Sequence, residues 1–356
     1  MKNVLVIFGG ASSEHDVSLI SANSIIKNIP QEKYNVILLG ITKEGEWLRF
    51  NGDIDLLPND NWIVDELCCP AIISPDAKNG GLIVFEKDGT VNRIDIDVIF
   101  PVLHGKNGED GTIQGLFQLA KIPFVGCDSL SSAASMDKGY TNMVADYLGV
   151  PQAKWVATKK YSYNKDPEKF INETVEYLGF PIFVKPANAG SSVGITKATD
   201  VDMLKEAIEL AFEHDNKVVF EENIDGFEVE CAVLGNDDLF ASVVGGITPC
   251  NDFYDFDAKY VTGTSELSIP AKLPEEKLAE VQKQAKKVFD GLGCSGISRV
   301  DFFVRKSDGM VMFNEINTIP GFTSISMYPK MMEASGISYS DLLDKALTLA
   351  IEKWSK

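Results

Sequence analysis

The sequence predicts an α/β N-terminal domain built on a doubly wound, Rossmann-like sheet, followed by an α+β second half. Apolar runs at residues 4–8, 36–41 and 98–102 have the length of buried strands. Residues 18–27 have a helical pattern between the first two runs, which gives a βαβ unit. The second half is richer in strand patterns than in helices. The 356 residues are enough for two or three domains.

The remaining elements follow in order along the chain. Helices are expected at residues 111–120, 131–148, 199–214 and 275–290, and strands at 180–185, 195–197, 218–222, 228–234 and 240–247. The third of these helices opens on Thr199-x-x-Asp202, which is similar to a capping box. Residues 248–263 are polar, aromatic and turn-like, and a long loop inside a compact domain is usually functional or disordered.

Composition narrows the classes of function. The net charge of −19 argues against general nucleic-acid binding, which needs basic patches, and no apolar run is long enough to span a membrane. The six cysteines show no CxxC pair or metal-binding spacing, which fits a reducing cytoplasm. Three histidines are too few for a multi-histidine zinc site. We therefore expect a cytoplasmic enzyme without nucleic-acid or membrane partners.

The most informative stretch predicts a β-hairpin near the C-terminal end. Asp308 begins an Asp-Gly pair between two apolar runs, which is a strong hairpin signal. A hairpin centred there places Asp301 opposite Glu315. It also places Arg299 opposite Asn317, and all four side chains then share one face. Two carboxylates and an amide are hard oxygen ligands that suit Mg²⁺, and burying them unpaired in a core would be costly.

A second candidate site is a glycine- and serine-rich loop at residues 186–194, directly after a predicted strand that ends in Lys185. Backbone amides in such a loop can hold phosphate oxygens, and the lysine can supply positive charge. Further along, Glu221, Glu222 and Glu228 could accept hydrogen bonds from adenine or ribose. They could equally form a solvated acidic edge.

Two more polar loops follow predicted strands of the first domain, at residues 9–18 and 101–111. The carboxyl ends of strands are where open α/β sheets bind ligands. Glu14 could hold a substrate ammonium group, or it could simply favour the N-terminus of a helix. His104 could be catalytic or structural.

Taken together, these stretches resemble the D-alanine–D-alanine ligase family of the ATP-grasp superfamily. The resemblance covers essentially the whole chain, and the conjunction of motifs is specific although each motif alone is weak. The motifs, in order, are Gly9-Gly10, Ser13-Glu14, Val17-Ser18, His104-Gly105, Gly108-Glu109-Asp110-Gly111, Met136-Asp137-Lys138, Lys185-Pro186, Gly190-Ser191-Ser192-Val193-Gly194, Ala258-Lys259-Tyr260, Arg299-Val300-Asp301 and residues 314–323.

The resemblance implies three domains in an ATP-grasp architecture. The expected boundaries are residues 1–126 for an N-terminal substrate domain, 127–222 for a central domain and 223–356 for a C-terminal metal-binding domain, with the loop at 248–263 over the site. ATP would lie between the central and C-terminal domains. The residues implied to bind it are Lys138, Lys185, Glu221, Glu222, Ile224, Glu228, Lys259, Phe303 and Asn314. Members of the family often have lysine where this chain has Glu222.

The implied reaction transfers the γ-phosphoryl group of ATP to the carboxylate of a first D-alanine and then joins the resulting acyl phosphate to a second D-amino acid. The metal ligands would be Asp301, Glu315 and Asn317, holding two Mg²⁺ ions or Mn²⁺ in their place. The catalytic residues would be Glu14, Ser191, Tyr260, Arg299 and Gly321. The substrate-binding residues would be Val17, His104, Ser326 and Met327.

The identity of the second substrate remains open between D-alanine and D-serine. Met327 stands where many members of the family have leucine, whereas the D-Ala–D-Ser relatives of the vancomycin-resistance type tend to carry arginine there. An apolar residue favours the methyl group of D-alanine. Two alternative functions are a different ATP-grasp ligation or carboxylation, and a nucleotide-binding sensor without turnover. A homodimer is usual in the family that the chain resembles.

Overall fold

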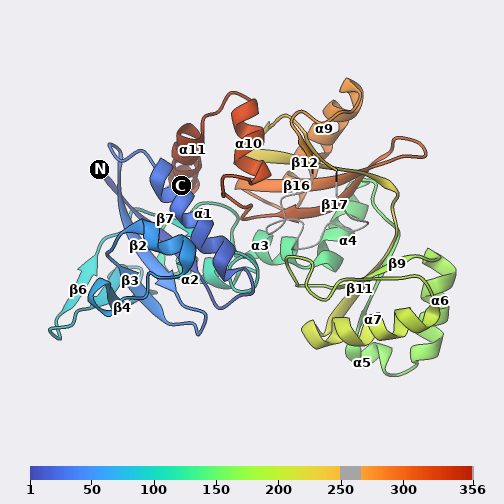
Figure 1. Cartoon of the computed structure of the whole chain (residues 1–356), viewed down its shortest axis with the longest axis horizontal. Coiled ribbons are helices and arrows are strands. Elements are labelled where there is room, and N and C mark those ends of the chain that lie inside the picture. The colour runs from blue at the N-terminus through green and yellow to red at the C-terminus, as the bar shows by residue number, and fades with distance from the viewer. Residues whose placement is uncertain (249–265, 355–356) are drawn as a thin grey trace.

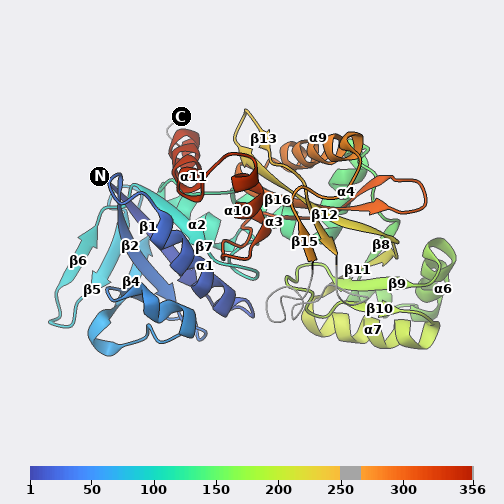
Figure 2. The same ribbon diagram turned by 45° about the horizontal axis from the view of Figure 1, so that its top comes forward.

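The computed structural model describes residues 1–248 and 266–354. Within them, three β-sheets form the framework. Figure 1 shows the first sheet at one end of the molecule and the second at the other, with the third between them. Figure 2 shows the same arrangement with helices α10 (Met327–Ala334) and α11 (Tyr339–Trp354) between the first and third sheets. The α/β fold class predicted from the sequence is confirmed.

The first sheet is mixed, with strand order β6-β5-β4-β3-β2-β1-β7. Strand β1 (Lys2–Gly9) pairs in parallel with β2 (Tyr34–Ile41) and with β7 (Val98–Val102), as the βαβ pattern predicts. The crossover helix α1 (His15–Asn28) joins β1 to β2, and α2 (Thr112–Ala120) follows β7. The remaining elements are the antiparallel strands β3 (Trp47–Phe50), β4 (Cys68–Ser74), β5 (Gly81–Phe85) and β6 (Val91–Ile94) and the short 3-10 helices η1 (Ile54–Asn59) and η2 (Asp65–Leu67).

The second sheet has four antiparallel strands in the order β10-β9-β11-β8. Helices α6 and α7 pack their apolar faces on it, so this part has its own core. Its elements are β8 (Trp155–Lys159), α5 (Lys160–Tyr163), α6 (Pro167–Leu178), β9 (Ile182–Pro186), β10 (Thr196–Ala198), α7 (Val201–His214) and β11 (Lys217–Glu222). The cap predicted for α7 is one residue off, because Asp200, not Thr199, accepts the N–H of Met203.

The third sheet is antiparallel along β15-β14-β12-β16-β17, with β13 paired to β12. Helix α9 (Glu275–Gly291) covers it with a stripe that includes Val281, Ala285 and Val288. The strands are β12 (Gly226–Gly235), β13 (Phe240–Ala241), β14 (Gly245–Thr248), β15 (Glu266–Ser268), β16 (Gly296–Arg305) and β17 (Val311–Asn317). The strand predicted at 240–247 is therefore two short strands, β13 and β14.

The single helix predicted at residues 131–148 is wrong, because the chain forms two helices, α3 (Ser129–Met136) and α4 (Lys138–Leu148). The break is at Asp137, whose extended backbone ends the first helix. Its carboxylate then accepts the N–H groups of Gly139 and Tyr140 and caps the second helix. Both helices contact β17 of the third sheet.

The predicted hairpin is confirmed as β16 and β17. Arg299 pairs with Asn317, and the register shifts directly after Asp301, which pairs with Glu315. A one-residue irregularity of this kind bends the strand, so the polar end of the hairpin and its turn are not one regular ladder.

A shared core joins the first sheet to the third. Leu342, Ala346 and other residues of α11 are buried in the same cluster as β1, β7 and the end of β12. Phe100 of β7 also meets Phe322, with ring centroids 6.0 Å apart at 89°. Burial of aromatic rings in this arrangement stabilises the contact beyond the area covered. The N- and C-terminal segments therefore lie at the same end of the molecule (Figure 1).

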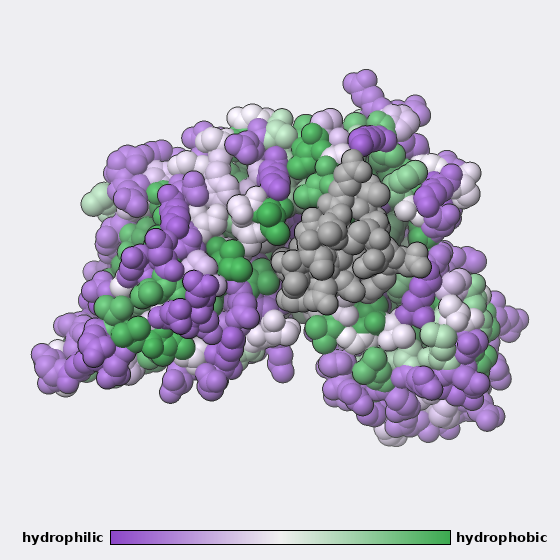
Figure 3. All heavy atoms as spheres, in the orientation of Figure 1, coloured by the Kyte–Doolittle hydropathy of each residue, from purple (hydrophilic) through white to green (hydrophobic). Residues whose placement is uncertain are grey.

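The surface and the thiols add two observations. Hydrophilic residues dominate the outer parts of both ends in the face drawn in Figure 3. In the described ranges, no helix has the length and apolar character needed to cross a lipid bilayer. The cysteines that the structure describes are all free thiols: Cys68, Cys69, Cys127, Cys231 and Cys294.

Gly9→Ala tests the turn that ends β1. Gly9 has φ +84°, and a Cβ atom there would lie 2.2 Å from the carbonyl oxygen of Ile41. We expect the substitution to lower the free energy of unfolding by about 2 kcal/mol or more, because a strained backbone and a backbone collision add together. The measurement is urea-induced unfolding followed by circular dichroism.

Gly45→Ala is the matched control. Gly45 has φ +88°, but a Cβ atom there would meet nothing within 4 Å. The free energy of unfolding of this variant should fall by only about 1–2 kcal/mol, which is the cost of the left-handed conformation for a residue with a Cβ atom. Equal losses in the two variants would show that the contact with Ile41 plays no part.

Candidate functional site

Two adjoining cavities hold most of the residues that the sequence singled out. The first has a volume of about 330 Å³ and lies where the first and third sheets meet the loop after β9. The second has a volume of about 640 Å³ and lies between the second and third sheets. Residues that line both include Lys138, Asn314 and Glu315, so the two cavities are neighbours.

The structure brings together the predicted residues as follows. Those on the first cavity are Glu14, His104, Lys138, Ser191, Arg299, Asn314, Glu315, Asn317, Gly321, Ser326 and Met327. Those on the second are Lys138, Lys185, Glu221, Glu222, Ile224, Glu228, Phe303, Asn314 and Glu315. Val17 is buried on α1 and lines neither cavity. Lys259, Tyr260 and most of the predicted loop at 248–263 lie outside the described residues.

Glu14 is positioned by the turn between β1 and α1. It precedes the first residue of the helix, and its carboxylate accepts a hydrogen bond from the Ser191 hydroxyl. A Cβ atom at Gly105 or Gly190 would lie 2.4 or 2.7 Å from Glu14 Oε2, so only glycine lets these two loops close on the carboxylate. A buried carboxylate facing a cavity is suited to hold a cationic group such as an ammonium.

His104 is buried near the start of the loop after β7. Burial lowers the pKa of its imidazole, although the Glu14 carboxylate opposes the shift. The ring is therefore neutral near pH 7. Because the Ile319 carbonyl oxygen lies 3.1 Å from Nδ1, that nitrogen carries the proton and donates it, and Nε2 faces the Ser21 hydroxyl at 3.5 Å.

Glu109 is a site residue that the sequence reasoning did not select, although it stands in the quoted motif after His104. Its Oε2 accepts the N–H of Gly105 at 2.9 Å, and its Oε1 accepts the N–H of Ile319 at 3.0 Å. Burial, together with the neighbouring Glu14 charge, raises the pKa of Glu109 to about 8.

Arg299 is held among carboxylates on the floor of the first cavity. Its Nε and one terminal nitrogen donate to the two oxygens of Asp301 at 2.8 and 2.7 Å. Glu230 Oε2 also lies 3.1 Å from Arg299 Nε. The sequence analysis did not select Glu230. Because side chains alternate along a strand, Glu230 shares one face of β12 with Glu228, and this alternation could have identified it. The guanidinium is thereby fixed at the cavity wall.

The second cavity has an ion pair at its base. Lys185 Nζ lies 2.5 Å from Glu221 Oε2, and Asn142 Nδ2 donates to Glu221 Oε1 at 3.2 Å. Lys138 Nζ donates to the carbonyl oxygen of Ala189 at 2.7 Å, at the start of the glycine- and serine-rich loop. Glu222 accepts the backbone N–H of Lys154 at 2.8 Å.

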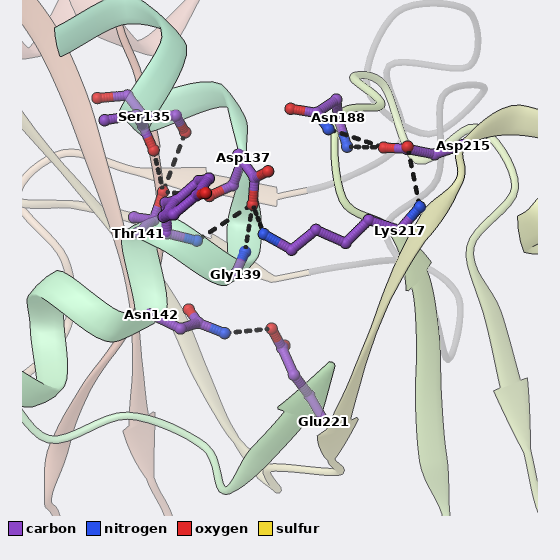
Figure 4. A network of polar contacts seen from close by, with 11 residues as sticks. Ser135, Asp137, Gly139, Thr141, Asn142, Asn188, Asp215, Lys217 and Glu221 are labelled. Atoms are coloured by element: carbon purple, nitrogen blue, oxygen red, sulfur yellow. Dashed lines mark hydrogen bonds and ion pairs between the residues drawn. The ribbon is translucent and has the colours of Figure 1, made fainter. Parts of the chain in front are cut away.

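A polar network fastens helix α4 to the second sheet beside this cavity, as Figure 4 shows. Lys217 Nζ lies 2.6 Å from the Asp137 carboxylate that caps α4, and Asn142 of the same helix reaches Glu221. On the other side, Asp215 accepts the side-chain and backbone N–H groups of Asn188. The loop after β9 is thus tied to β11, and Lys138 is fixed at the first residue of α4.

The hairpin also offers a set of donors for a divalent cation. Asp301, Glu315 and Asn317 supply carboxylate and amide oxygens from neighbouring strands, which fits Mg²⁺. Asn317 Nδ2 donates to Asp301 Oδ2 at 3.0 Å. A cation would therefore compete with Arg299 and Asn317 for the Asp301 carboxylate.

Comparison with known proteins assigns the two halves of the chain to the same family. The family described as D-ala D-ala ligase N-terminus matches residues 3–127, and D-ala D-ala ligase C-terminus matches residues 144–348. A D-alanine–D-alanine ligase of Acetivibrio thermocellus is 50% identical over 366 residues, covering 99% of this chain and 97% of that protein. One of Caldicellulosiruptor bescii is 50% identical over 350 residues, with 98% and 95% covered.

Solved structures of similar fold and sequence indicate the same family. The VanG D-Ala:D-Ser ligase from Enterococcus faecalis has a TM-score of 0.89 and 44% identity, with 98% of this chain and 99% of that chain covered. The D-alanine-D-alanine ligase from Coxiella burnetii has a TM-score of 0.86 and 32% identity, with 99% and 95% covered.

The raised pKa of Glu109 predicts a pH dependence of stability in the ligand-free protein. Between the ordinary value of 4.5 and about 8, the folded protein keeps a proton that the unfolded chain has lost. The free energy of unfolding should then fall as the pH rises through this window, by up to about 1.4 kcal/mol per pH unit from this group. Urea unfolding at pH 5, 6, 7 and 8 should show a shallower decline for Glu109→Gln than for the wild type. Parallel curves would contradict the assignment.

Proposed function

The chain belongs to the D-alanine–D-alanine ligase family, and we propose that it joins two D-alanine molecules with ATP through an acyl phosphate. It is an ATP-dependent D-alanine–D-alanine ligase. The observation that carries the proposal for the site is that the two cavities adjoin and share Lys138, Asn314 and Glu315. Carboxylates and a guanidinium suited to an amino acid line one, and lysines with an acidic edge line the other.

In the proposed reaction, the γ-phosphoryl group of ATP moves to the carboxylate of the first D-alanine and leaves ADP. The amino group of the second D-alanine attacks the carbonyl carbon of the acyl phosphate and loses a proton. The tetrahedral intermediate then expels inorganic phosphate and leaves the dipeptide. The lysines neutralise charge on the phosphoryl group during transfer.

The first cavity is proposed to bind the amino acids. Glu14 holds the ammonium group of the first D-alanine, with Ser191 fixing the carboxylate of Glu14. His104 neighbours the first substrate's carboxylate, and Ser326 binds that of the second. Arg299 and the Gly321 amide stabilise the oxyanion, for which one donor is typically worth about 10²–10³ in kcat.

The second cavity is proposed to bind ATP between the central and C-terminal domains. Lys138 and Lys185 contact phosphates, and Glu221 and Glu228 bind adenine and ribose. Phe303 packs on the base. Asp301, Glu315 and Asn317 would hold two Mg²⁺ ions, which supply charge neutralisation at the phosphates when bound. Lys259 and Tyr260 are proposed to complete the site from the loop over it.

D-alanine is the proposed second substrate because the wall beside Ser326 is apolar. Met327 is buried, and Leu267 and Ile325 line the same cavity. These side chains suit a methyl group better than a hydroxymethyl group. D-serine is the second candidate, favoured by the likeness to the VanG D-Ala:D-Ser ligase.

The wider role is proposed from the product. D-alanyl-D-alanine would be a peptidoglycan precursor, made in the cytoplasm by a homodimer. A different ATP-grasp activity would need neither Glu14 nor Ser191 at the amino-acid site, and a sensor would bind ATP without turnover.

The product assay tests the function directly. With ATP and Mg²⁺, we expect D-alanine alone to drive phosphate release and to give the dipeptide, identified by mass spectrometry. With D-serine added, the mixed product should stay the minor one, since the apolar side chains of Leu267, Ile325 and Met327 offer a hydroxyl group no hydrogen bond. Phosphate release that does not depend on D-alanine would reject the ligase, and a dominant mixed product would replace D-alanine by D-serine as second substrate.

Glu315→Gln tests the metal site. We expect the variant to fold normally but to lose nearly all turnover, because an amide binds Mg²⁺ more weakly than a carboxylate. The measurement is kcat over a range of Mg²⁺ concentrations. Asp308→Asn, at the exposed turn of the same hairpin, removes an equal charge and should keep normal activity. Near-normal turnover of Glu315→Gln at saturating Mg²⁺ would exclude the role.

A further inference from the structure

Both backbone polar groups of Ile319, in the loop after β17, are held by a loop of the first domain. Glu109 Oε1 accepts the N–H of Ile319 at 3.0 Å, and His104 Nδ1 donates to the Ile319 carbonyl oxygen at 3.1 Å. The two partners are five residues apart in the loop after β7, and Ile319 is more than two hundred residues away. The Ile319 side chain is buried, and the hydrogen bond to His104 is buried with it.

The clamping loop is itself fixed within the first domain. Glu109 Oε2 accepts the N–H of Gly105, and the Ser12 hydroxyl donates to the His104 carbonyl oxygen at 2.9 Å. Each oxygen of the Glu109 carboxylate therefore has its own backbone partner, one in the loop of the first domain and one in the loop of the third sheet. A shorter or uncharged side chain cannot satisfy both partners equally well.

Ile319 lies two residues before Gly321. The intervening residue is Pro320, which has a fixed φ and limits how the chain can turn between them. On the far side of Gly321, the N–H of Phe322 approaches the Ser21 hydroxyl of α1 at 3.4 Å. The segment that carries the Gly321 amide is therefore held at both ends by side chains of the first domain.

We propose that Glu109 and His104 are positioning residues that set the Gly321 amide for the oxyanion by holding the backbone N–H and C=O of Ile319. This inference rests on the proposed function. It assigns Glu109 a role that acts through the backbone, without contact to the reacting atoms. The alignment of the amide then depends on the first domain, which also supplies Glu14, so binding of the amino group and stabilisation of the oxyanion are set by one rigid unit.

The charges around Glu109 are consistent with this role. Glu14 at the start of α1 raises the pKa of the Glu109 carboxyl and Arg299 on β16 lowers it. An ammonium group bound beside Glu14 would offset the charge that disfavours ionised Glu109. The ionised carboxylate accepts both N–H groups best.

Glu109→Gln is the test, because the amide keeps the shape but turns one acceptor into a donor that faces a backbone N–H. We expect kcat for dipeptide formation to fall about 10²-fold, as small misplacements of catalytic groups do, while the KM for ATP stays within about twofold of the wild type. Steady-state phosphate release with varied ATP and D-alanine measures both, and thermal unfolding monitors the fold.

Asp110→Asn is the matched control. Asp110 is the next residue, and its carboxylate also accepts two backbone N–H groups, those of Asn107 and Thr112, but within its own loop. This variant should keep kcat within about threefold of the wild type. An equal loss of kcat in Asp110→Asn and Glu109→Gln would overturn the inference, since the loss would then reflect loop structure alone.

Glu109→Asp keeps the carboxylate charge but shortens the side chain, so it distinguishes the effect of charge from that of side-chain length. It also replaces Glu109→Gln as the test variant if Glu109→Gln does not fold. Its carboxylate is one methylene too short to meet both Gly105 and Ile319, so we expect a slow kcat with an unchanged KM for ATP. Wild-type turnover in Glu109→Asp would overturn the clamp. A wild-type protein that makes no dipeptide would overturn the proposed function and the clamp together, which distinguishes that failure from a failure of the clamp alone.

Discussion

The apolar core shared by the first and third sheets is the constraint on which the site depends. Phe100 of β7 and Phe322 after β17 meet inside it, and helix α11 packs against α1 and β7 of the first domain and against β12 and β16 of the third sheet. Rings and aliphatic side chains in this core are almost fully buried, and interiors of this kind are close-packed and resist displacement. The loops that leave this core, after β1, β7 and β17, therefore meet at fixed positions.

This arrangement explains why an acidic chain can build a site for charged substrates. Three carboxylates near the cavities have defined partners: Glu14 has Ser191, Asp301 has Arg299, and Glu221 has Lys185. Pairing lowers the cost of keeping charge in a partly buried place. The net charge of −19 is a sum over the whole chain and says little about these local pairs.

The two cavities differ in what holds them together. The walls of the first cavity come from the first and third sheets, which share a core. The walls of the second cavity come partly from the second sheet, which has a core of its own and is tied to α4 by polar contacts such as Lys217 with Asp137. Polar ties between separate cores are generally a weaker connection than a shared apolar core.

The sequence by itself determined the elements with strong local patterns and the residues that a strand places side by side. The βαβ opening and the pairing of Asp301 with Glu315 follow from apolar runs, an Asp-Gly turn and alternation of side chains. Only the tertiary structure decided the rest. The antiparallel strands β3 to β6 are short, and their buried and exposed residues do not alternate regularly. The break between α3 and α4 depends on one capping side chain, Asp137. Glu109 grips Ile319 across more than two hundred residues, and no local pattern can report a contact that exists only because a buried core brings two distant loops together.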